Sequence, residues 1–377
     1  MVTLSPKVDS INNNSDKKKK LLLPTSIFLV ILSAIAFSFY AYTHKKPLYD
    51  LNKLKNAPNY TRSGPSKNLL DMLTAIYSIP DVQYHEFTGP YLTVTEEGRI
   101  RSDCKQLFKT LQSPPTIWPP PKQMPPDMFN GYTMNGIIPV LDNYRFSESE
   151  KANGGKATHW SKEKIVDMGS MDITCGAYNH KECEQIIQKY GEKFINNKKG
   201  VVIGSSTPWA EAALLAAGAS HITTIEYRNI TTNHPNLTTY RPQDVAHQYL
   251  SGKWNPVDFL FTYSSVEHDG LGRYGDPLNP YGDLESFAKA KCLLKPGGVL
   301  FVGLPVGPDA ILWNAHRQYG PIRFKLMLNM GWVPIDLVGE PFKSITELQS
   351  PKYTTDHPIW LLRKGGISDD SLYDYSN

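Results

Sequence analysis

The chain has 377 residues, of which 40% are hydrophobic, 11% aromatic and 20% charged. This composition excludes a disordered or fibrous protein and is typical of one large globular domain or two smaller ones. The net charge is +4, and five Lys and two Asp lie in residues 1–43, so the remainder is close to neutral. A near-neutral chain lacks the basic field that holds a phosphate backbone, so we expect no nucleic acid as a partner. Four Cys without a C-x-x-C pair predict neither a disulfide-dense scaffold nor a metal site.

An apolar run near the start of the chain predicts a single transmembrane helix that anchors the protein in a lipid bilayer. The run begins at Leu21, ends at Tyr42 and contains no charged residue. At ~1.5 Å per residue it would span about 33 Å, enough to cross the hydrocarbon core. A cleaved signal peptide is the alternative, but its apolar part usually has only ~7–15 residues. Lys17 and the three Lys after it precede the run, which favours a cytosolic N-terminus and a main domain in the ER or Golgi lumen.

Other features permit this luminal orientation. Asn59, Asn229 and Asn236 each begin an N-x-T triplet, the acceptor for N-glycosylation. Such triplets also arise by chance, so they allow the orientation without proving it. Cys175 and Cys183 lie eight positions apart and would pair as a disulfide in an oxidising lumen, or remain two buried thiols.

The predicted parts of the chain are a cytosolic tail at 1–20, the anchor at 21–43, an irregular stem at 44–130, a main domain at 131–365 and a tail at 366–377. Within the stem, residues 67–79 have apolar side chains at helical spacing, which predicts a short amphipathic helix. Residues 113–126 contain seven prolines, which exclude a helix or a central strand. This segment is expected to be an extended strap packed on the domain or, alternatively, a proline-rich ligand for an aromatic groove.

Helix and strand patterns alternate from about residue 178. Strands are expected at 200–204, 222–226, 257–263, 299–304, 332–338 and 358–362, and helices at 179–194, 208–216 and 284–294. Short apolar strands joined through helices require crossover connections. The pattern therefore predicts an α/β fold with a doubly wound, mostly parallel sheet that is covered on both faces.

Candidate ligand-binding residues follow three of these strands. In doubly wound sheets a ligand binds beyond the carboxyl ends of the strands, where the strand order reverses. Gly204 ends the first strand and leads into a turn and a helix N-terminus, whose free N–H groups can bind an anion. Glu226 ends the second strand, where a dinucleotide fold places the acid that binds ribose hydroxyls. The strand at 257–263 leads into a dense polar loop at 264–277 that contains three acidic residues, His268 and Arg273.

These features together resemble a class I S-adenosylmethionine-dependent methyltransferase over roughly residues 131–364. The sequences GLGRYGDP and LKPGGVLFVGLPVG, between 270 and 307, also resemble an uncharacterised methyltransferase-like family known mainly as a domain of unknown function. The resemblance implies a seven-stranded Rossmann-like sheet with S-adenosylmethionine between the first and fourth strands. The cofactor-binding residues that it implies are Gly204, Ser205, Ser206, Trp209, Glu226 and Ser265. Trp209 would lie over the cofactor through cation–π attraction or, alternatively, pack on the sheet.

Methyl transfer from a sulfonium is an in-line displacement that also removes a proton when the acceptor is a hydroxyl. His268 is the candidate base because an imidazole titrates near neutral pH, and its alternative role is to cap the strand end. Glu267 and Asp269 complete the catalytic candidates, and Glu267 would hold the acceptor or the cofactor amine. Arg273, Tyr274 and Asp276 are candidates for binding the acceptor. Arg273 and Asp276 would alternatively pair with each other and lock the loop.

The acceptor is inferred from the predicted location. A luminal domain favours O-methylation of a glycan or of a hydroxyl-bearing small molecule. The methyltransferase class usually has an acid two residues before the first Gly and a second Gly after it, whereas this chain has Val202 and Ser205-Ser206. This departure motivates the alternative of a catalytically inactive, membrane-tethered binding protein. A nicotinamide oxidoreductase is the weaker alternative because the chain has no G-x-G-x-x-G run after its first strand.

Overall fold

The computed structural model describes residues 66–79, 82–88, 92–96, 98–109, 119–147, 157–178, 180–340 and 357–365. The chain divides into two compact units, 1–50 and 51–377, and all the described residues belong to the second. The predicted anchor, the acceptor triplet at Asn59 and both predicted tails lie outside the described residues. Among the helices that are described, none is both long and apolar enough to span a bilayer.

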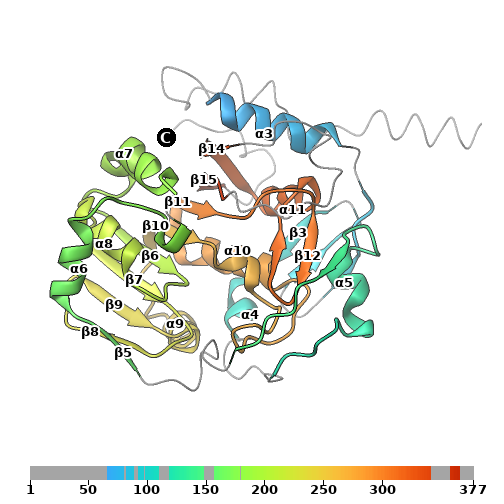
Figure 1. The fold of residues 1–377 in the computed structure, drawn as a ribbon, viewed down its shortest axis with the longest axis horizontal. Helices are drawn as coiled ribbons and strands as arrows, with labels where there is room; N and C mark the ends of the chain where they lie inside the picture. The colour runs from blue at the N-terminus through green and yellow to red at the C-terminus, as the bar shows by residue number, and fades with distance from the viewer. Residues whose placement is uncertain are drawn as a thin grey trace, which may run out of the picture. The chain divides into compact units, whose positions relative to one another are not determined.

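A seven-stranded mixed sheet forms the centre of the described unit, in the order β14-β15-β11-β10-β6-β7-β9 (Figure 1). The strands are β6 (Lys199–Ile203), β7 (His221–Ile225), β9 (Leu237–Tyr240), β10 (Val257–Tyr263), β11 (Leu294–Gly303), β14 (Trp332–Val338) and β15 (Ile359–Lys364). Four neighbouring pairs are parallel, while β15 runs antiparallel to both β11 and β14. The six strands expected from the sequence are present, and β9 joins them at the edge.

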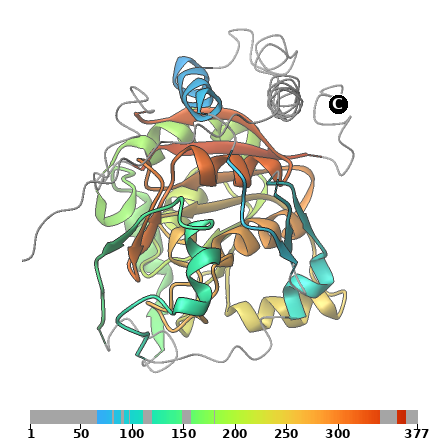
Figure 2. The same cartoon turned by 90° about the vertical axis from the view of Figure 1, so that its right-hand side faces the viewer.

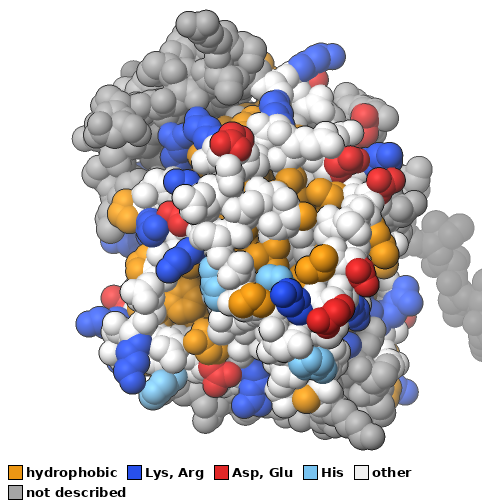
Figure 3. Space-filling view, turned by 90° about the vertical axis from the view of Figure 1, so that its left-hand side faces the viewer, with side chains coloured by type: hydrophobic (Ala, Val, Ile, Leu, Met, Phe, Trp, Pro, Cys, Tyr) orange, Lys and Arg blue, Asp and Glu red, His pale blue; other side chains and the backbone are white. Residues whose placement is uncertain are grey.

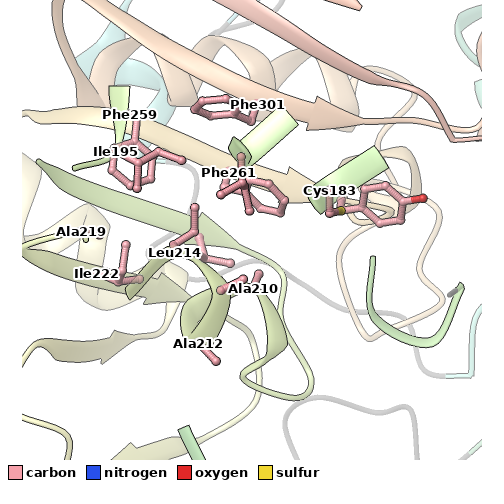
Figure 4. Packing of buried hydrophobic residues seen from close by; sticks show 14 of the residues in the cluster. Cys183, Ile195, Ala210, Ala212, Leu214, Ala219, Ile222, Phe259, Phe261 and Phe301 are labelled. Atoms are coloured by element: carbon pink, nitrogen blue, oxygen red, sulfur yellow. The ribbon is translucent and has the colours of Figure 1, made fainter. Parts of the chain in front are cut away.

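Side chains alternate across the sheet because successive residues of a strand point to opposite faces. On β10, Phe259, Phe261 and Tyr263 share one face and pack in a buried cluster with residues of the helices on that side. Those helices are α6 (Lys162–Gly169), α7 (Glu182–Phe194) and α8 (Trp209–Ala216). Figure 4 shows Leu214 of α8 beneath Phe261, with Phe301 of the neighbouring strand above. Burial of both faces explains the nearly continuous apolar sequence of β10.

Helices cover the second face of the sheet as well (Figure 2). They are α9 (Pro242–Leu250), α10 (Gly282–Leu293) and α11 (Pro321–Asn329). α9 and α11 begin with Pro at the first helical position, where the missing N–H has no intrahelical partner to lose. Helices on both faces make the sheet doubly wound, as expected from the alternating pattern.

Smaller sheets flank the central one. Their strands are β1 (Phe87–Thr88), β2 (Leu92–Val94), β3 (Ile100–Ser102), β4 (Val140–Asp142), β5 (Thr158–Trp160), β8 (Ile230–Thr232), β12 (Ala310–Trp313) and β13 (His316–Gln318). β1, β2 and β3 form one sheet, β13, β12 and β4 a second, and β5 and β8 a third. Short helices complete the unit: α5 (Phe129–Thr133), η4 (Gly176–Tyr178) and η5 (Val266–His268).

The region expected to be an irregular stem holds ordered elements that pack on the main sheet. α3 (Lys67–Ser78) is the amphipathic helix predicted at 67–79, and it buries Leu69, Met72, Leu73 and Ile76. It lies along β14 at the edge of the sheet, and Asn68 donates a hydrogen bond to the Gly339 carbonyl at 2.8 Å. α4 (Cys104–Lys109) lies beside α9 (Figure 2). The described residues between 66 and 109 are therefore part of the folded unit.

The described part of the proline-rich segment, 119–125, is held against the domain. The Trp313 indole N–H donates to the Pro121 carbonyl at 3.0 Å, and the Tyr144 hydroxyl donates to the Pro120 carbonyl at 2.8 Å. Proline lacks a backbone N–H, so its carbonyl oxygen is the main-chain group that can anchor such a segment. These contacts agree with the strap interpretation.

All four Cys of the chain form disulfides, Cys175 with Cys183 and Cys104 with Cys292. The first closes an eight-residue separation and holds η4 beside α7, as one of the two sequence interpretations expected. The second joins α4 to α10 across 188 positions, a pairing that the spacing did not suggest. On the face shown in Figure 3, acidic and basic side chains are interspersed, in keeping with the near-neutral composition.

Candidate functional site

A cavity of about 400 Å³ lies at the carboxyl ends of β6, β7 and β10, and α4, α9 and α10 complete its walls. The chain runs from β6 through β7 to β9 and then crosses to β10 on the other side of β6. The strand order therefore reverses between β6 and β10, the place where doubly wound sheets bind ligands. The volume is in the range of small-molecule sites, roughly 300–1,000 Å³.

Residues predicted from separate strand ends meet in this cavity. Those in its wall are Gly204, Ser206, Glu226, Ser265, His268, Asp269, Tyr274 and Asp276. The candidates Ser205, Trp209, Glu267 and Arg273 are not among the lining residues. The parallel strands bring the first group together because their carboxyl ends share one edge of the sheet.

The turn after β6 is built around Gly204. Its φ of 72° lies in the left-handed region, which glycine adopts without strain. A Cβ at this position would overlap the Ser265 hydroxyl and come within 2.6 Å of the Ser265 Cβ. The loops after β6 and β10 therefore touch here, and the contact requires a residue without a side chain.

Glu226 follows β7 and binds the turn at Gly204. Its Oε2 accepts a hydrogen bond from the Ser205 backbone N–H at 3.0 Å, and its Oε1 accepts one from the Arg228 N–H at 3.1 Å. Burial raises the pKa of this carboxyl, while the N–H donors and the Arg228 charge oppose the rise. Each carboxylate oxygen has a second lone pair, so Glu226 can also accept from ligand hydroxyls.

The side chain of Ser205, a predicted cofactor-binding residue, points to the interior of the fold. Its hydroxyl lies 2.7 Å from the Thr207 carbonyl oxygen and 3.0 Å from Glu211 Oε2. Glu211 is fully buried and accepts a second hydrogen bond from Thr224 at 2.7 Å. Burial raises the pKa of Glu211 to about 7. Ser205 contributes its backbone N–H to Glu226 and its hydroxyl to this internal network.

Trp209 packs in the core rather than over the cavity. Its ring centroid lies 5.9 Å from that of Phe261 and 6.0 Å from that of Tyr263, both in edge-to-face geometry. It contacts the buried cluster on the face covered by α7 and α8. This is the packing role that the sequence left open, and it replaces the cation–π role.

The loop after β10 begins with a hydrogen-bonded group. Ser264 has a φ of 48°, which is strained for a residue with a side chain. Its hydroxyl donates to Glu267 Oε1 at 2.7 Å and lies 2.6 Å from the Tyr178 hydroxyl. Strained backbone of this kind persists only where the surrounding structure holds it in place, and it is found mostly at functional sites.

Glu267 and His268 lie close together in the loop after Ser264 and form a pair that is largely removed from solvent. The Nδ1 of His268 lies 2.5 Å from the Ala315 carbonyl oxygen, which can only accept, so Nδ1 carries the proton and Nε2 the lone pair. Nε2 lies 3.6 Å from Glu267 Oε1. Burial raises the pKa of Glu267 to about 8 and lowers that of His268 to about 3. Both side chains are therefore mostly uncharged at neutral pH.

Asp276 locks the rest of the loop through backbone groups. Its Oδ2 accepts hydrogen bonds from the N–H groups of Gly270 at 2.7 Å and Gly272 at 3.1 Å, and its Oδ1 accepts from Tyr274 at 3.2 Å. The loop's own backbone N–H groups therefore hold Asp276 in place. The Arg273 guanidinium lies 5.0 Å from the Tyr274 ring centroid.

The cavity wall includes residues that sequence reasoning missed. Phe108 of α4 lines it and stacks on Tyr249 of α9 at 4.3 Å between ring centroids. Arg228 and Lys289 supply cationic groups to the same wall. Other missed lining residues are Tyr227, Pro242, Val245, Ser286, Ala290 and Leu293. No strand-end signal marks Phe108, because α4 reaches the cavity through tertiary packing.

Asp269 lies in the same wall of the cavity. The Ser286 hydroxyl donates to Asp269 at 2.5 Å, and burial raises the pKa of Asp269 to about 7.

Arg317 of β13 is a second missed residue and organises the loop from the interior. It is fully buried, and its guanidinium donates to the carbonyls of Glu267 at 3.3 Å and Asp269 at 2.6 Å. Its charge is balanced by Asp283, 3.5 Å away, which also binds Arg323 with a shortest distance of 2.7 Å. The sequence gives little sign of this role, since arginine is usually a surface residue.

The family model described as "Caenorhabditis protein of unknown function, DUF268" matches residues 197–363. This segment contains β6 to β15 and most of the cavity wall. Among curated proteins, no sequence matches the chain.

Two solved methyltransferases are similar to about half of the chain. The 1,6-didemethyltoxoflavin-N1-methyltransferase of Burkholderia thailandensis, solved with S-adenosylhomocysteine, has 14% sequence identity and a TM-score of 0.33, covering 50% of this chain and 79% of its own. The N-methyltransferase NodS of Bradyrhizobium japonicum has 12% identity and a TM-score of 0.31, covering 50% of this chain and 98% of its own. Likeness at this level assigns neither an activity nor a substrate.

Proposed function

We propose that this protein is an S-adenosylmethionine-dependent methyltransferase whose cofactor binds in the cavity between β6 and β10. The observation that carries the proposal is the contact of Gly204 with Ser265, which joins the two predicted half-sites into one wall. Glu226 lies in that wall, where the resemblance to class I methyltransferases expects a ribose-binding acid. The order of the sheet, which reverses between β6 and β10, supports the same placement.

The cavity residues fit this cofactor in kind. Glu226 would accept hydrogen bonds from the sugar hydroxyls, and the Gly204 turn leaves room for close approach of a ligand to the backbone. Pro242, Val245 and Phe108 provide apolar surface for a flat base. Asp269 and Glu226 offer negative charge toward a sulfonium. When bound, the cofactor supplies an electrophilic methyl group.

His268 is the residue that would take a proton from a hydroxyl acceptor. It lines the cavity, and the bond from Nδ1 to Ala315 leaves the lone pair on Nε2. A positioned base of this kind is typically worth about 10²–10⁴ in rate. The imidazole resists a positive charge, so the proton would move on to Glu267 Oε1, 3.6 Å away, once that carboxyl has released its own proton. The acceptor that we propose is a hydroxyl of a glycan or of a small molecule.

Calorimetric titration of the full-length protein with S-adenosylmethionine tests the cofactor. We expect binding in the wild type and a loss of about tenfold to a hundredfold in affinity for Glu226→Gln, because hydrogen bonds to a charged group are worth about 1.5–3 kcal/mol. Glu192→Gln is the matched control, since Glu192 is exposed and accepts a hydrogen bond from Asn196, which lies just beyond the end of α7. A wild type that gives no heat at millimolar cofactor would exclude the proposal.

A catalytically inactive binding protein is the second candidate. Val202 occupies the position where the methyltransferase class usually has an acid, and burial lowers the pKa of His268 to about 3, which weakens it as a base. This candidate expects a ligand in the cavity without methyl transfer. Methyl transfer that the wild type performs and His268→Ala loses would support the enzyme, whereas ligand binding without any transfer by the wild type would support the binding protein.

We also propose that the protein is a single-pass membrane protein, anchored through Leu21 to Tyr42, with the described unit in the lumen of the ER or Golgi. The pairing of all four Cys supports this, because disulfides persist mainly in oxidising compartments. Asn236 and Asn229 are both exposed acceptors.

The side of the membrane on which the described unit lies is testable in cells. We expect an endoglycosidase to increase the gel mobility of the wild-type protein and Asn236→Gln to reduce that change. Asn229 lies next to Glu226 and Arg228 in a second, polar cavity of about 160 Å³, so we expect it to stay unmodified in active protein. An unglycosylated unit that protease digests in sealed microsomes would place it on the cytosolic side instead.

A further inference from the structure

A row of polar side chains connects the desolvated pair at the cavity with the protein surface. From His268 Nε2 to Glu267 Oε1 the distance is 3.6 Å. From Glu267 Oε1 to the Ser264 hydroxyl it is 2.7 Å, and from there to the Tyr178 hydroxyl 2.6 Å. Each hydroxyl in the row can both donate and accept, so the hydrogen bonds can reverse direction.

The two ends of the row differ in their exposure. Glu267 is 1% exposed, and its Oε2 has no hydrogen-bond partner among the described residues. Tyr178 is 43% exposed although it is a large aromatic residue. The row therefore begins at a buried carboxyl next to the cavity and ends at a hydroxyl that solvent can reach.

Tyr178 is held at this position by its surroundings. It ends η4, in the segment that the Cys175–Cys183 disulfide closes. Its ring centroid lies 4.9 Å from that of His357 and 5.7 Å from that of Tyr263. Removal of the hydroxyl alone would leave these ring contacts in place.

We propose that Tyr178 and Ser264 form a proton relay that carries the proton released in the cavity from Glu267 to solvent. The inference rests on the proposed methyl transfer. As the acceptor oxygen takes the methyl group, its O–H bond breaks and the proton binds His268 Nε2. Glu267, which is mostly protonated at neutral pH, gives its own proton to the Ser264 oxygen while Ser264 gives one to Tyr178, and the carboxylate so formed takes the proton from His268. Tyr178 releases one proton to water, so both hydroxyls end as they began.

The direction of transfer follows from burial. A buried imidazolium is disfavoured and a buried carboxyl prefers its neutral form, so the proton moves from His268 to Glu267. Glu267 must then lose it before the next turnover, and its hydrogen bond with Ser264 leads to the exposed hydroxyl of Tyr178. The ionisable groups that face this pair are Asp269 on the same loop, Arg273 beyond it, Tyr263 of β10, His316 and Arg317 of β13, His357 before β15 and Tyr178 itself.

The relay is tested by the proton-exchange rate of Glu267, which needs neither cofactor nor acceptor. Full-length protein labelled with ¹³C at the glutamate carboxyls is titrated by NMR, with Glu267→Gln to assign the signal. In the wild type we expect one averaged resonance with a midpoint near pH 8, because burial raises the pKa of Glu267 to about 8. In Tyr178→Phe we expect the exchange rate to fall at least about tenfold while the midpoint pH changes little. A positioned group that transfers a proton typically raises a rate by about 10²–10⁴.

Tyr144→Phe is the control, because Tyr144 loses an equivalent hydroxyl whose partner is the Pro120 carbonyl, outside the row. Ser264→Gly breaks the row at its second link and tolerates the positive φ, so it serves if Tyr178→Phe does not fold. Equal exchange in the wild type and in Tyr178→Phe would overturn the relay, as would equal slowing in Tyr144→Phe. If the protein binds no S-adenosylmethionine, the methyl-transfer proposal fails whatever this exchange rate is.

Discussion

Asp283→Asn is expected to lower the free energy of unfolding by about 3–5 kcal/mol, the usual cost of leaving a buried charge without its partner. Asp283 has no exposed surface and binds Arg323 through both carboxylate oxygens at 2.7–3.0 Å. It also accepts the Tyr319 hydroxyl at 2.7 Å and faces Arg317 at 3.5 Å. Asparagine would leave two buried guanidinium groups without the carboxylate that they share. Urea denaturation at pH 7 followed by circular dichroism measures the difference.

The loss should depend on pH in one direction. Burial alone would raise the pKa of Asp283, but the charges of Arg317 and Arg323 overcome this and lower it. The carboxylate therefore stabilises the fold at neutral pH, and this contribution disappears as the pH falls below the usual range of an aspartate. Asp258→Asn is the control: Asp258 binds Lys295 at 2.6 Å near the surface, where an ion pair is worth about 0–1 kcal/mol. Similar losses in the two variants would contradict the assigned role of the buried cluster.

Gly204→Ala is expected to weaken the binding of S-adenosylmethionine at least about tenfold. The new Cβ would overlap the Ser265 side chain, so the loops after β6 and β10 must separate at the cavity wall. Overpacking of this kind costs about 1–3 kcal/mol, and a left-handed backbone costs a residue with a Cβ about 1–2 kcal/mol more. We expect the melting temperature to fall by several degrees and the affinity for the cofactor to fall at least about tenfold. Calorimetry on folded protein measures the second effect separately from the first.

Gly252→Ala separates backbone strain from the clash. Gly252 has the same φ of 72°, but a Cβ there would meet nothing within 4 Å. This variant should lose only the stability that the left-handed backbone costs a residue with a Cβ. It should bind the cofactor like the wild type. If Gly252→Ala and Gly204→Ala bind equally well, the contact between the two loops has no role in the site.

The central strands were predictable because their own sequences carry the signal. β10 is buried on both faces and is apolar at nearly every position, so its bounds follow from the residues alone. β9 is an edge strand, Leu237–Tyr240, with a single aliphatic side chain, and a run so short and polar does not differ from a loop. β12 and β13 gain their burial from tertiary packing on other segments, which no local period reports.

The residues of the candidate site also divide into those that the sequence predicts and those that it does not. Glu226 and His268 were predictable because they follow apolar strands directly, and a parallel sheet gathers such positions at one edge. Phe108 and Arg317 were not, since one lies in a short helix far from the sheet in sequence and the other is an arginine inside the core. Trp209 shows that position alone does not assign a role: it follows the first strand closely, yet it packs against Phe261.

The bond between Cys104 and Cys292 decides what can be expressed as a fragment. A clone that starts at residue 131, the predicted start of the main domain, lacks α4 and leaves a reactive thiol in the same helix as the cavity residues Lys289 and Leu293. Such a clone would be prone to crosslinking with itself on storage. Conversely, a protease that nicks the intact protein between these two positions yields two pieces that migrate together until a reductant is added to the gel.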